Sequence, residues 1–254
     1  VGDSPAATYI DLACTDTTLL PAFAAVAVDL HAAVGFRPQD AVGAVAATLR
    51  SWRWFWTVDA AGLSGETALG LFTELWFLER WLGLPKGVAA WVGPTGHRHD
   101  FVTPTASIEA KGTRIRSDGG ATHRIANLDQ LDDPETGHLW LFSLRVVADP
   151  LAANTLPGVI ERIADSLGTY PDALLTVRER LAQAGWTPAH ANRYLQPWRV
   201  VAEELYRVGD GFPRLTRNTF PKGVPPGVGD VTYTVDLAAC TSFKVASAPG
   251  QVGF

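Results

Sequence analysis

The sequence predicts an α/β fold in which a mixed central sheet is flanked by helices. Apolar residues recur at helical spacing in the first third of the chain and again after residue 154. Between these regions lie several short segments with the alternation, or the continuous apolar run, of strands. The chain has 254 residues, of which 47% are hydrophobic and 19% charged, so it can build a substantial core. Helices on both sides of a cluster of strands favour a layered α/β protein.

The N-terminal segment, residues 1–60, is predicted to hold one strand and two helices. The strand lies within residues 7–16, and the helices span residues 18–33 and 38–56. Three tryptophans and a phenylalanine crowd into residues 51–56. They could stack on nucleic-acid bases, but we favour the heavy end of a core helix. The sequence opens on a valine and contains no Met, so we expect the natural start to lie further upstream.

A long helix is predicted over residues 64–83. Ser64 is a good N-cap, and Gly83 with the proline that follows ends the helix. One face of this helix is apolar; Glu79 falls inside that face and Glu74 at its edge. A carboxylate on a buried stripe is costly unless it pairs with another group or binds a cation. Both glutamates are therefore candidates for a functional role.

The middle of the chain, residues 61–170, is predicted to be the core of the fold. After the long helix, strands are predicted over residues 87–94, 99–103, 106–113, 122–131 and 138–148. The last of these is long, apolar and rich in branched residues, which is typical of a central strand.

The C-terminal segment, residues 171–254, is predicted to add helices and a closing strand to the same domain, because no linker separates it. Helical periodicity covers residues 155–168 and 170–185, and we expect it to continue over residues 196–208. A loop rich in Pro and Gly follows, and residues 231–240 then alternate as a closing strand does.

Three side chains carry the candidate chemistry. Glu109 and Lys111 are two positions apart on a predicted strand, so they point to the same side. A hairpin-like return from the preceding strand can bring Asp100 beside Glu109. Two carboxylates held so close together repel each other unless a cation lies between them, and Mg²⁺ prefers such oxygen ligands. This set suits attack of water on a phosphodiester, although the same spacing also fits a surface hairpin with a salt bridge.

The charge balance excludes a protein that coats nucleic acid through a strong positive net charge, because the formal net charge is −5. Contact with DNA must then rely on a local cluster, and the stretch between residues 95 and 125 is such a place. Its histidines could add positive charge at lower pH. The basic residues are Arg98, Lys111, Arg114, Arg116 and Arg124; the acids are Asp100, Glu109 and Asp118; the histidines are His97, His99 and His123.

Other common sites are missing from the sequence. There is no Walker A loop, no dinucleotide-binding fingerprint and no nucleophile elbow. Cys14 and Cys240 form neither a disulfide framework nor a zinc motif. No signal peptide or membrane span is visible, so we expect a cytoplasmic protein without a membrane partner.

Several segments, in this order, resemble the PD-(D/E)XK nuclease superfamily: "GLFTELWFLERWL", "WVGPTGHRHDF", "IEAKGT" and "LDQL". More narrowly, they resemble a bacterial family of PD-(D/E)XK motif proteins found beside restriction and phage-defence genes. The likeness continues through "TLPGVIERIADSL", "FPRLT" and "VTYTVDLAAC", and so covers nearly the whole chain. It implies a restriction-endonuclease-like fold, with residues 61–170 as the nuclease core.

The resemblance also implies roles for individual residues. Asp100 and Glu109 would be Mg²⁺ ligands, completed by the carbonyl of Ala110. Lys111 would orient or deprotonate the attacking water. The sequence departs from the motif in one place, because His99 stands where the motif has proline. Proline there only shapes the entry to the strand, so its loss does not by itself remove activity.

Two further positions are implied with alternatives left open. Members of the superfamily often add a glutamate from the preceding helix, and Glu74 and Glu79 compete for that role. The match over "GLFTEL" favours Glu74, whereas the helical wheel leaves Glu79 as the acid that needs a buried partner. Gln130 could support a metal ligand or contact DNA.

The function implied is a DNA endonuclease that depends on Mg²⁺, or on Mn²⁺ in its place, in a restriction or phage-defence system. Its partners would be double-stranded DNA and either a second copy or other subunits of that system. The alternative is a DNA-binding or assembly subunit on the same fold that does not cleave. An unrelated α/β protein with a chance motif is a third interpretation, against which the fixed order of the four motifs argues.

Overall fold

The computed structural model describes residues 9–15, 17, 20–57, 62–115 and 121–254. The chain divides into two compact units, Val1–Trp52 and Arg53–Phe254. The predicted segments 61–170 and 171–254 both lie within the second unit. In the described part of the chain, no helix combines the length and the apolar character that crossing a bilayer requires.

The first unit holds α1 (Leu20–Phe36) and most of α2 (Ala41–Thr57), joined by a short 3₁₀ turn. The Trp52 indole Nε1 on α2 donates a 3.2 Å hydrogen bond to Asp29 on α1. Trp52 is buried, as a core interpretation requires; the side chains of residues 51 and 53–57 lie outside the described ones. Both helices were predicted, but the N-terminal strand is wrong over residues 9–15, which form no regular element.

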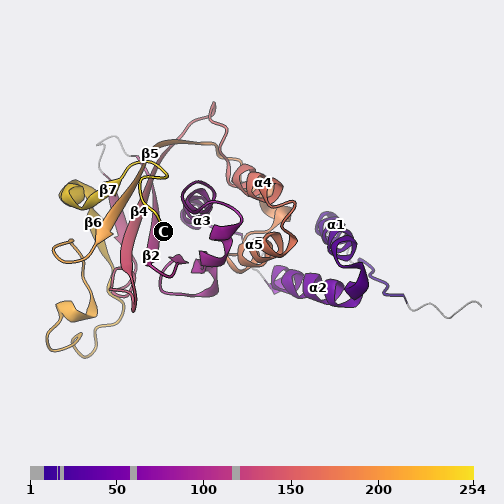
Figure 1. Ribbon diagram of the computed structural model, residues 1–254, viewed down its shortest axis with the longest axis horizontal. Coiled ribbons are helices and arrows are strands. Elements are labelled where there is room, and N and C mark those ends of the chain that lie inside the picture. Colours follow the sequence, from indigo (N-terminus) through magenta and orange to yellow (C-terminus); the bar gives the residue numbers. More distant parts are fainter. Residues whose placement is uncertain (1–8, 16, 18–19, 58–61, 116–120) are drawn as a thin grey trace, which may run out of the picture. The chain divides into compact units, whose positions relative to one another are not determined.

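The second unit is built on a mixed five-stranded sheet (Figure 1). The strand order is β1-β2-β4-β5-β7; β2 and β4 run parallel, and the other neighbours are antiparallel. Strand β4 is central, buried over most of its length, as its apolar run predicted. The strands are β1 (Phe101–Val102), β2 (Ala106–Arg114), β4 (His138–Ala148), β5 (Trp198–Val208) and β7 (Lys244–Ala246).

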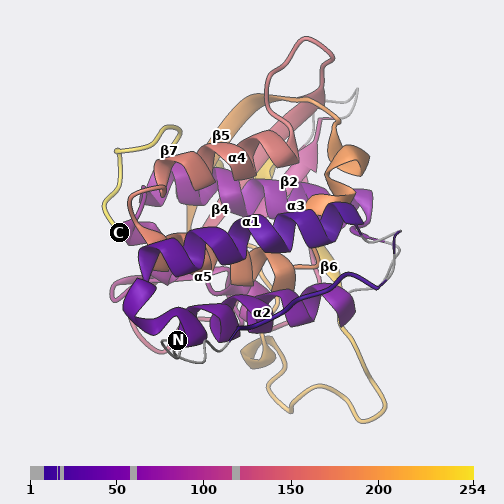
Figure 2. The same ribbon diagram turned by 90° about the vertical axis from the view of Figure 1, so that its right-hand side faces the viewer.

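Each face of this sheet is covered by a different layer. Alternate residues of β4 point to opposite faces: Phe142 joins one hydrophobic cluster and Leu141 the other. Figures 1 and 2 show α3 and α4 side by side on one face, and Figure 1 shows β6 on the other. The first layer is formed by α3 (Gly65–Phe77), a π-helical turn (Leu78–Leu82), α4 (Leu156–Ser166) and α5 (Pro171–Gln183). The second is formed by the antiparallel ribbon of β3 (Thr122–Ile125) and β6 (Tyr233–Asp236), followed by a 3₁₀ segment (Leu237–Phe243).

Helix α3 packs very closely on β2, and a glycine makes this approach feasible. A Cβ atom on Gly112 would overlap Thr73 Oγ1 and lie 3.2 Å from the backbone oxygen of Leu69. Ser64 caps the start of the helix as predicted, because its side chain accepts a hydrogen bond from Thr67 N. The sequence therefore places the helix carrying Glu74 directly against the strand carrying Glu109 and Lys111.

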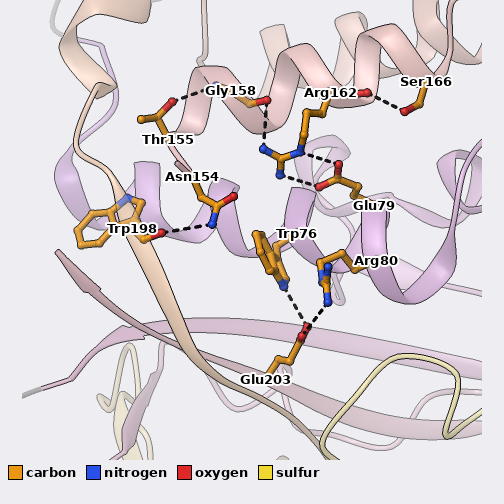
Figure 3. Close-up of polar contacts among 10 residues, drawn as sticks. All are labelled: Trp76, Glu79, Arg80, Asn154, Thr155, Gly158, Arg162, Ser166, Trp198 and Glu203. Atoms are coloured by element: carbon orange, nitrogen blue, oxygen red, sulfur yellow. Dashed lines mark hydrogen bonds and ion pairs between the residues drawn. The ribbon is translucent and has the colours of Figure 1, made fainter. Parts of the chain in front are cut away.

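The far end of α3 is tied to β5 by one carboxylate. Glu203 Oε2 accepts hydrogen bonds from the indoles of Trp76 (3.0 Å) and Trp81 (2.8 Å). Its Oε1 accepts a 3.3 Å bond from Arg80 (Figure 3). Two indole donors and a guanidinium satisfy a carboxylate on the helix-facing side of the sheet, so its burial is not left uncompensated.

Four element predictions in the second unit are wrong in whole or in part. Residues 87–94 form two 3₁₀ turns, and their contact with the sheet is a single bridge from Trp91 to Phe101. Val88 and Trp91, three positions apart, bury one side of this segment, a spacing that suits a 3₁₀ turn. Residues 196–208 were expected to be helical but contain β5. The expected strand over residues 122–131 is β3 only at Thr122–Ile125, and the one over residues 231–240 is β6 only at Tyr233–Asp236.

Candidate active site

The antiparallel pair β1–β2 brings the two predicted acids together. Phe101 pairs with Ile108, so one step back along β1 sets Asp100 opposite Glu109. Asp100 Oδ2 accepts a 2.8 Å hydrogen bond from Ala110 N. The Lys111 ammonium lies 2.7 Å from Glu109 Oε1, and this carboxylate is only 2% exposed. Asp100, Glu109 and Lys111 therefore meet as the sequence predicted.

A third carboxylate joins this group from α3. Glu74 Oε2 accepts a 2.7 Å hydrogen bond from the Trp91 indole. A Cβ atom on Gly93 would lie 2.8 Å from Asp100 Oδ1 and 3.2 Å from Glu74 Oε2, so both carboxylates lie against the same piece of backbone. Any larger residue at position 93 would push the two acids away, and the glycine keeps them close.

Glu79 lies elsewhere. Its two carboxylate oxygens each accept a 2.9 Å hydrogen bond from Arg162 on α4 (Figure 3). Glu74 and Glu79 are five positions apart, about 140° around an α-helix, so they lie on different sides of the helical segment. The partner of Glu79 is thus an arginine, in an ion pair that is partly exposed rather than buried, and Glu74 is the helix glutamate beside Asp100.

Burial and crowding shift the pKa values of these groups. Burial, the Asp100 charge and Glu109 raise the pKa of Glu74 well above its ordinary value, despite the Trp91 hydrogen bond. Burial also raises the pKa of Asp100, against the opposing effects of Lys111 and the Ala110 N–H. Burial and Asp100 raise the pKa of Glu109 to about 8. Burial lowers the pKa of Lys111, but Glu109 and Asp100 outweigh it and the net direction is upward.

The acids line a cleft of about 640 Å³ that also has a basic side. Gln130 lies on its wall, where its Oε1 accepts a 2.7 Å hydrogen bond from Ala126 N. The cationic side chains at the cleft come from β2 and β3: Lys111, Arg114 and Arg124. Arg116 and Asp118, also part of the predicted charge cluster, lie outside the described residues. The cleft thus has a carboxylate end and a cationic wall.

Over residues 3–238 the chain matches the family model described as "Putative PD-(D/E)XK family member, (DUF4420)". The chain belongs to the DUF4420 family. This confirms the superfamily that the motifs suggested, and with the five-stranded mixed sheet it confirms a restriction-endonuclease-like α/β fold. Membership indicates a nuclease-like protein. Neither a curated protein nor a solved structure matches the chain.

PD-(D/E)XK nucleases generally use divalent metals, and the donor set of this DUF4420 protein suits a hard cation. Three carboxylates face one ammonium, so the cluster would carry excess negative charge when ionised. Within the described residues, no three His, Cys, Asp or Glu side chains form a preformed metal-binding group. A hard cation such as Mg²⁺ usually takes one or two carboxylates, with waters completing its shell, and Asp100 with Glu109 could supply them.

The histidines of the DUF4420 chain behave differently from the sequence expectation. Burial and Arg98 lower the pKa of His99 to about 4, and burial, Lys111 and Arg145 lower the pKa of His123 to about 3. These two side chains therefore stay neutral and add no charge at mildly acidic pH. His99 is buried outside the cleft lining, whereas His123 lines the cleft. Sequence reasoning assigned His123 no role beyond the charge cluster, because its place over the sheet depends on the pairing of β3 with β6.

Proposed function

We propose that this chain is a metal-dependent nuclease that hydrolyses phosphodiester bonds in double-stranded DNA. The observation that carries the proposal is the convergence of Asp100, Glu109 and Lys111 on neighbouring strands at the acidic end of a cleft. The residue types, their order and their surroundings are those of the PD-(D/E)XK superfamily, to which the chain belongs.

The residues would divide the work as follows. Asp100 and Glu109 would hold Mg²⁺ or Mn²⁺, with the Ala110 carbonyl as a further ligand and Glu74 as a nearby acid. The cation would supply stabilisation of the negative charge that develops on the phosphate. Lys111, held protonated by the carboxylates, would donate hydrogen bonds to the attacking water or to a phosphate oxygen. Gln130 would contact DNA or support the cleft wall.

The test is nicking and linearisation of supercoiled plasmid DNA with Mg²⁺ or Mn²⁺. We expect wild-type protein to cleave, EDTA to stop cleavage, and Asp100→Asn to abolish it while the protein stays folded. Cleavage that survives in Asp100→Asn would remove this site from the reaction. Methylated and unmethylated plasmids in parallel address the proposed role in restriction or phage defence.

The biological setting is proposed on the resemblance alone. A restriction or phage-defence role would place the protein in the cytoplasm with chromosomal and invading DNA. Both strands of a duplex must be cut, so a second copy or another subunit of the system would supply the second cut.

A non-cleaving DNA-binding or assembly subunit is the second candidate, and one observation favours it. Glu109 is engaged by Lys111 at 2.7 Å, and the described acids form no preformed three-ligand group. A binder would retain DNA affinity in Asp100→Asn and show no cleavage in wild-type protein. Calorimetric titration with Mn²⁺ separates the two: a nuclease site binds the ion with Asp100 and loses that binding in the variant.

A further inference from the structure

A buried polar pair lies beside Lys111 that neither the motif nor the carboxylate cluster uses. The parallel register of β2 and β4 pairs Lys111 with Ser143, so these two side chains share a face of the sheet. His123 on β3 covers this position, and its Nε2 lies 2.7 Å from Ser143 Oγ. Ser143 is 0% exposed and His123 only 2%, yet His123 borders the cleft.

The direction of the hydrogen bond between His123 and Ser143 depends on the tautomer of the imidazole, and the buried Ser143 hydroxyl favours one tautomer. Within the described part of the chain, His123 Nε2 is the acceptor that the Ser143 hydroxyl reaches. If Nε2 carried the proton instead, the buried hydroxyl hydrogen would lack an acceptor among the described residues, which is unfavourable. The favoured arrangement has Ser143 donating to Nε2. The imidazole, which is neutral in this environment, then carries its proton on Nδ1.

Because Ser143 engages Nε2, the Nδ1–H group is the polar group of the His123 ring that can reach the cleft. It bonds no residue among those that the structure describes. Two cationic groups lie close by, since both Lys111 and Arg145 act electrostatically on His123. Arg145 pairs in register with Thr113 of the cleft wall, and its buried Nε has no partner among the described residues, whereas its Nη2 binds Glu204 at 3.1 Å. Arg145 itself does not line the cleft, but Lys111 and Arg124 do so beside His123, and these cationic donors suit an anion.

We propose that His123 contacts the substrate, donating a hydrogen bond from Nδ1 to a non-bridging phosphate oxygen, while Ser143 acts as the positioning residue that fixes its tautomer. This inference rests on the proposed function only in taking the anion to be a DNA phosphate. A neutral donor beside Lys111 adds hydrogen bonding without adding charge, so the ammonium keeps its partnership with Glu109. Loss of one donor to a reacting phosphate costs about 10²–10³-fold in rate where the bond strengthens in the transition state.

The first test needs no catalysis. In protein labelled with ¹⁵N-histidine, NMR identifies which ring nitrogen of His123 is protonated; the His123→Asn variant assigns the signals by their loss. We expect a proton on Nδ1, and a shift of that signal when inorganic phosphate is added. A proton on Nε2, or an Nδ1 signal unmoved by phosphate, would overturn the proposal. A shift of equal size in the exposed His97 and His138 would identify an adventitious ion only and would also overturn it.

The second test compares two amide replacements. Asn places its NH₂ near the position of Nδ1, and Gln places its amide near Nε2. With plasmid DNA and Mn²⁺, we expect His123→Asn to keep kcat within about tenfold of wild type, and His123→Gln to lose about 100-fold. KM should change less than kcat. Equal kcat values, or a faster His123→Gln enzyme, would contradict the proposal, because a purely structural His123–Ser143 bond is better kept by Gln.

Failure of the inference and failure of the proposed function are separable. If wild-type protein does not cleave DNA, the proposed function fails, and the phosphate titration still decides whether His123 binds an anion. If wild type cleaves and Asp100→Asn does not, the function stands, and the Asn–Gln comparison decides the role of His123. Thermal melting of both variants accompanies the kinetics; should either fail to fold, the NMR result on wild-type protein decides.

Discussion

The Lys111 ammonium lies 2.7 Å from Glu109 Oε1, two positions away on the same face of β2. This ion pair links the lysine of the PD-(D/E)XK motif directly to Glu109, one of the two acids of the motif. Removing the ammonium leaves Glu109 buried without its cationic partner and takes a donor from the cleft. We therefore expect Lys111→Ala to lower the rate of plasmid cleavage by about 100-fold or more. The exposed Lys222, outside the cleft lining, provides the matched variant Lys222→Ala. Equal cleavage by the two variants would remove Lys111 from the mechanism.

Glu74 and Glu79 lie on one continuous helical segment but should respond differently to the same substitution. Glu74→Gln replaces the ionisable carboxyl beside Asp100 with an amide that can neither ionise nor exchange a proton. We therefore expect at least a tenfold loss of cleavage, with little change in melting temperature. Glu79→Gln breaks a partly exposed ion pair with Arg162, which costs about 0.2–1 kcal/mol, and should leave cleavage unchanged. Kinetics and thermal melting of both variants check this. The opposite pattern would move the supporting acid to Glu79.

Gly112 sets the distance between α3 and β2. A methyl group there would overlap Thr73 Oγ1, so we expect Gly112→Ala to destabilise the protein by about 1–3 kcal/mol. A methyl group at Gly70, on the same helix, would have no other atom within 4 Å, and Gly70→Ala should stabilise by about 0.5–1 kcal/mol. Urea denaturation of both variants gives the comparison. Equal stabilities would mean that α3 shifts freely on the sheet.

The protein without metal should lose stability as the pH rises. Burial and Asp100 raise the pKa of Glu109 from 4.5 to about 8, so between these values the folded protein holds a proton that the unfolded chain has released. Stability from this group is complete below pH 4.5 and is lost by about pH 8. We expect a melting temperature several degrees lower at about pH 9 than at about pH 6 in EDTA, at about 2–4 °C per kcal/mol.

Two controls sharpen this pH experiment. Glu109→Gln cannot ionise at that position, so its melting temperature should vary less over the same range. Divalent cation added at the alkaline end should restore part of the loss in wild-type protein, because it binds the ionised carboxylates of the folded state. A wild-type protein that is more stable at the alkaline end than at the acidic end would contradict the raised pKa.

The sequence predicted those parts of the fold in which local pattern and tertiary role agree. Strand β4 is apolar on both sides because both faces of the sheet are covered, and its continuous run of apolar residues predicts this burial. The residues of β5 predict a helix instead, because Glu203 and Glu204 interrupt the alternation of a strand. Both charges have partners that only the folded chain supplies, Trp76 and Trp81 for Glu203 and Arg145 for Glu204. Local spacing cannot contain that information.

The three motif residues of the candidate site were predictable from the sequence, whereas the helix glutamate and His123 were less so. Asp100, Glu109 and Lys111 lie on two adjacent strands, so strand geometry and a tight return suffice to bring them together. The choice between Glu74 and Glu79 depended on which side of the helix meets β2 and which meets α4, and a helical wheel cannot show this for a helix packed on both sides. His123 reaches the cleft through pairing with a strand from the far end of the chain, and its neighbours in sequence carry no sign of it.

The pairing of β3 with β6 also sets an order of events during synthesis. The strand that carries His123 finds its antiparallel partner only in Tyr233–Asp236, which leave the ribosome long after β1, β2 and α3 have emerged. A nascent chain would thus contain Asp100, Glu109 and Lys111 well before it contained β6, which completes the β3–β6 wall. For a nuclease of the kind proposed above, this order would leave the cleft without its β3–β6 wall until the C-terminal region has been synthesised.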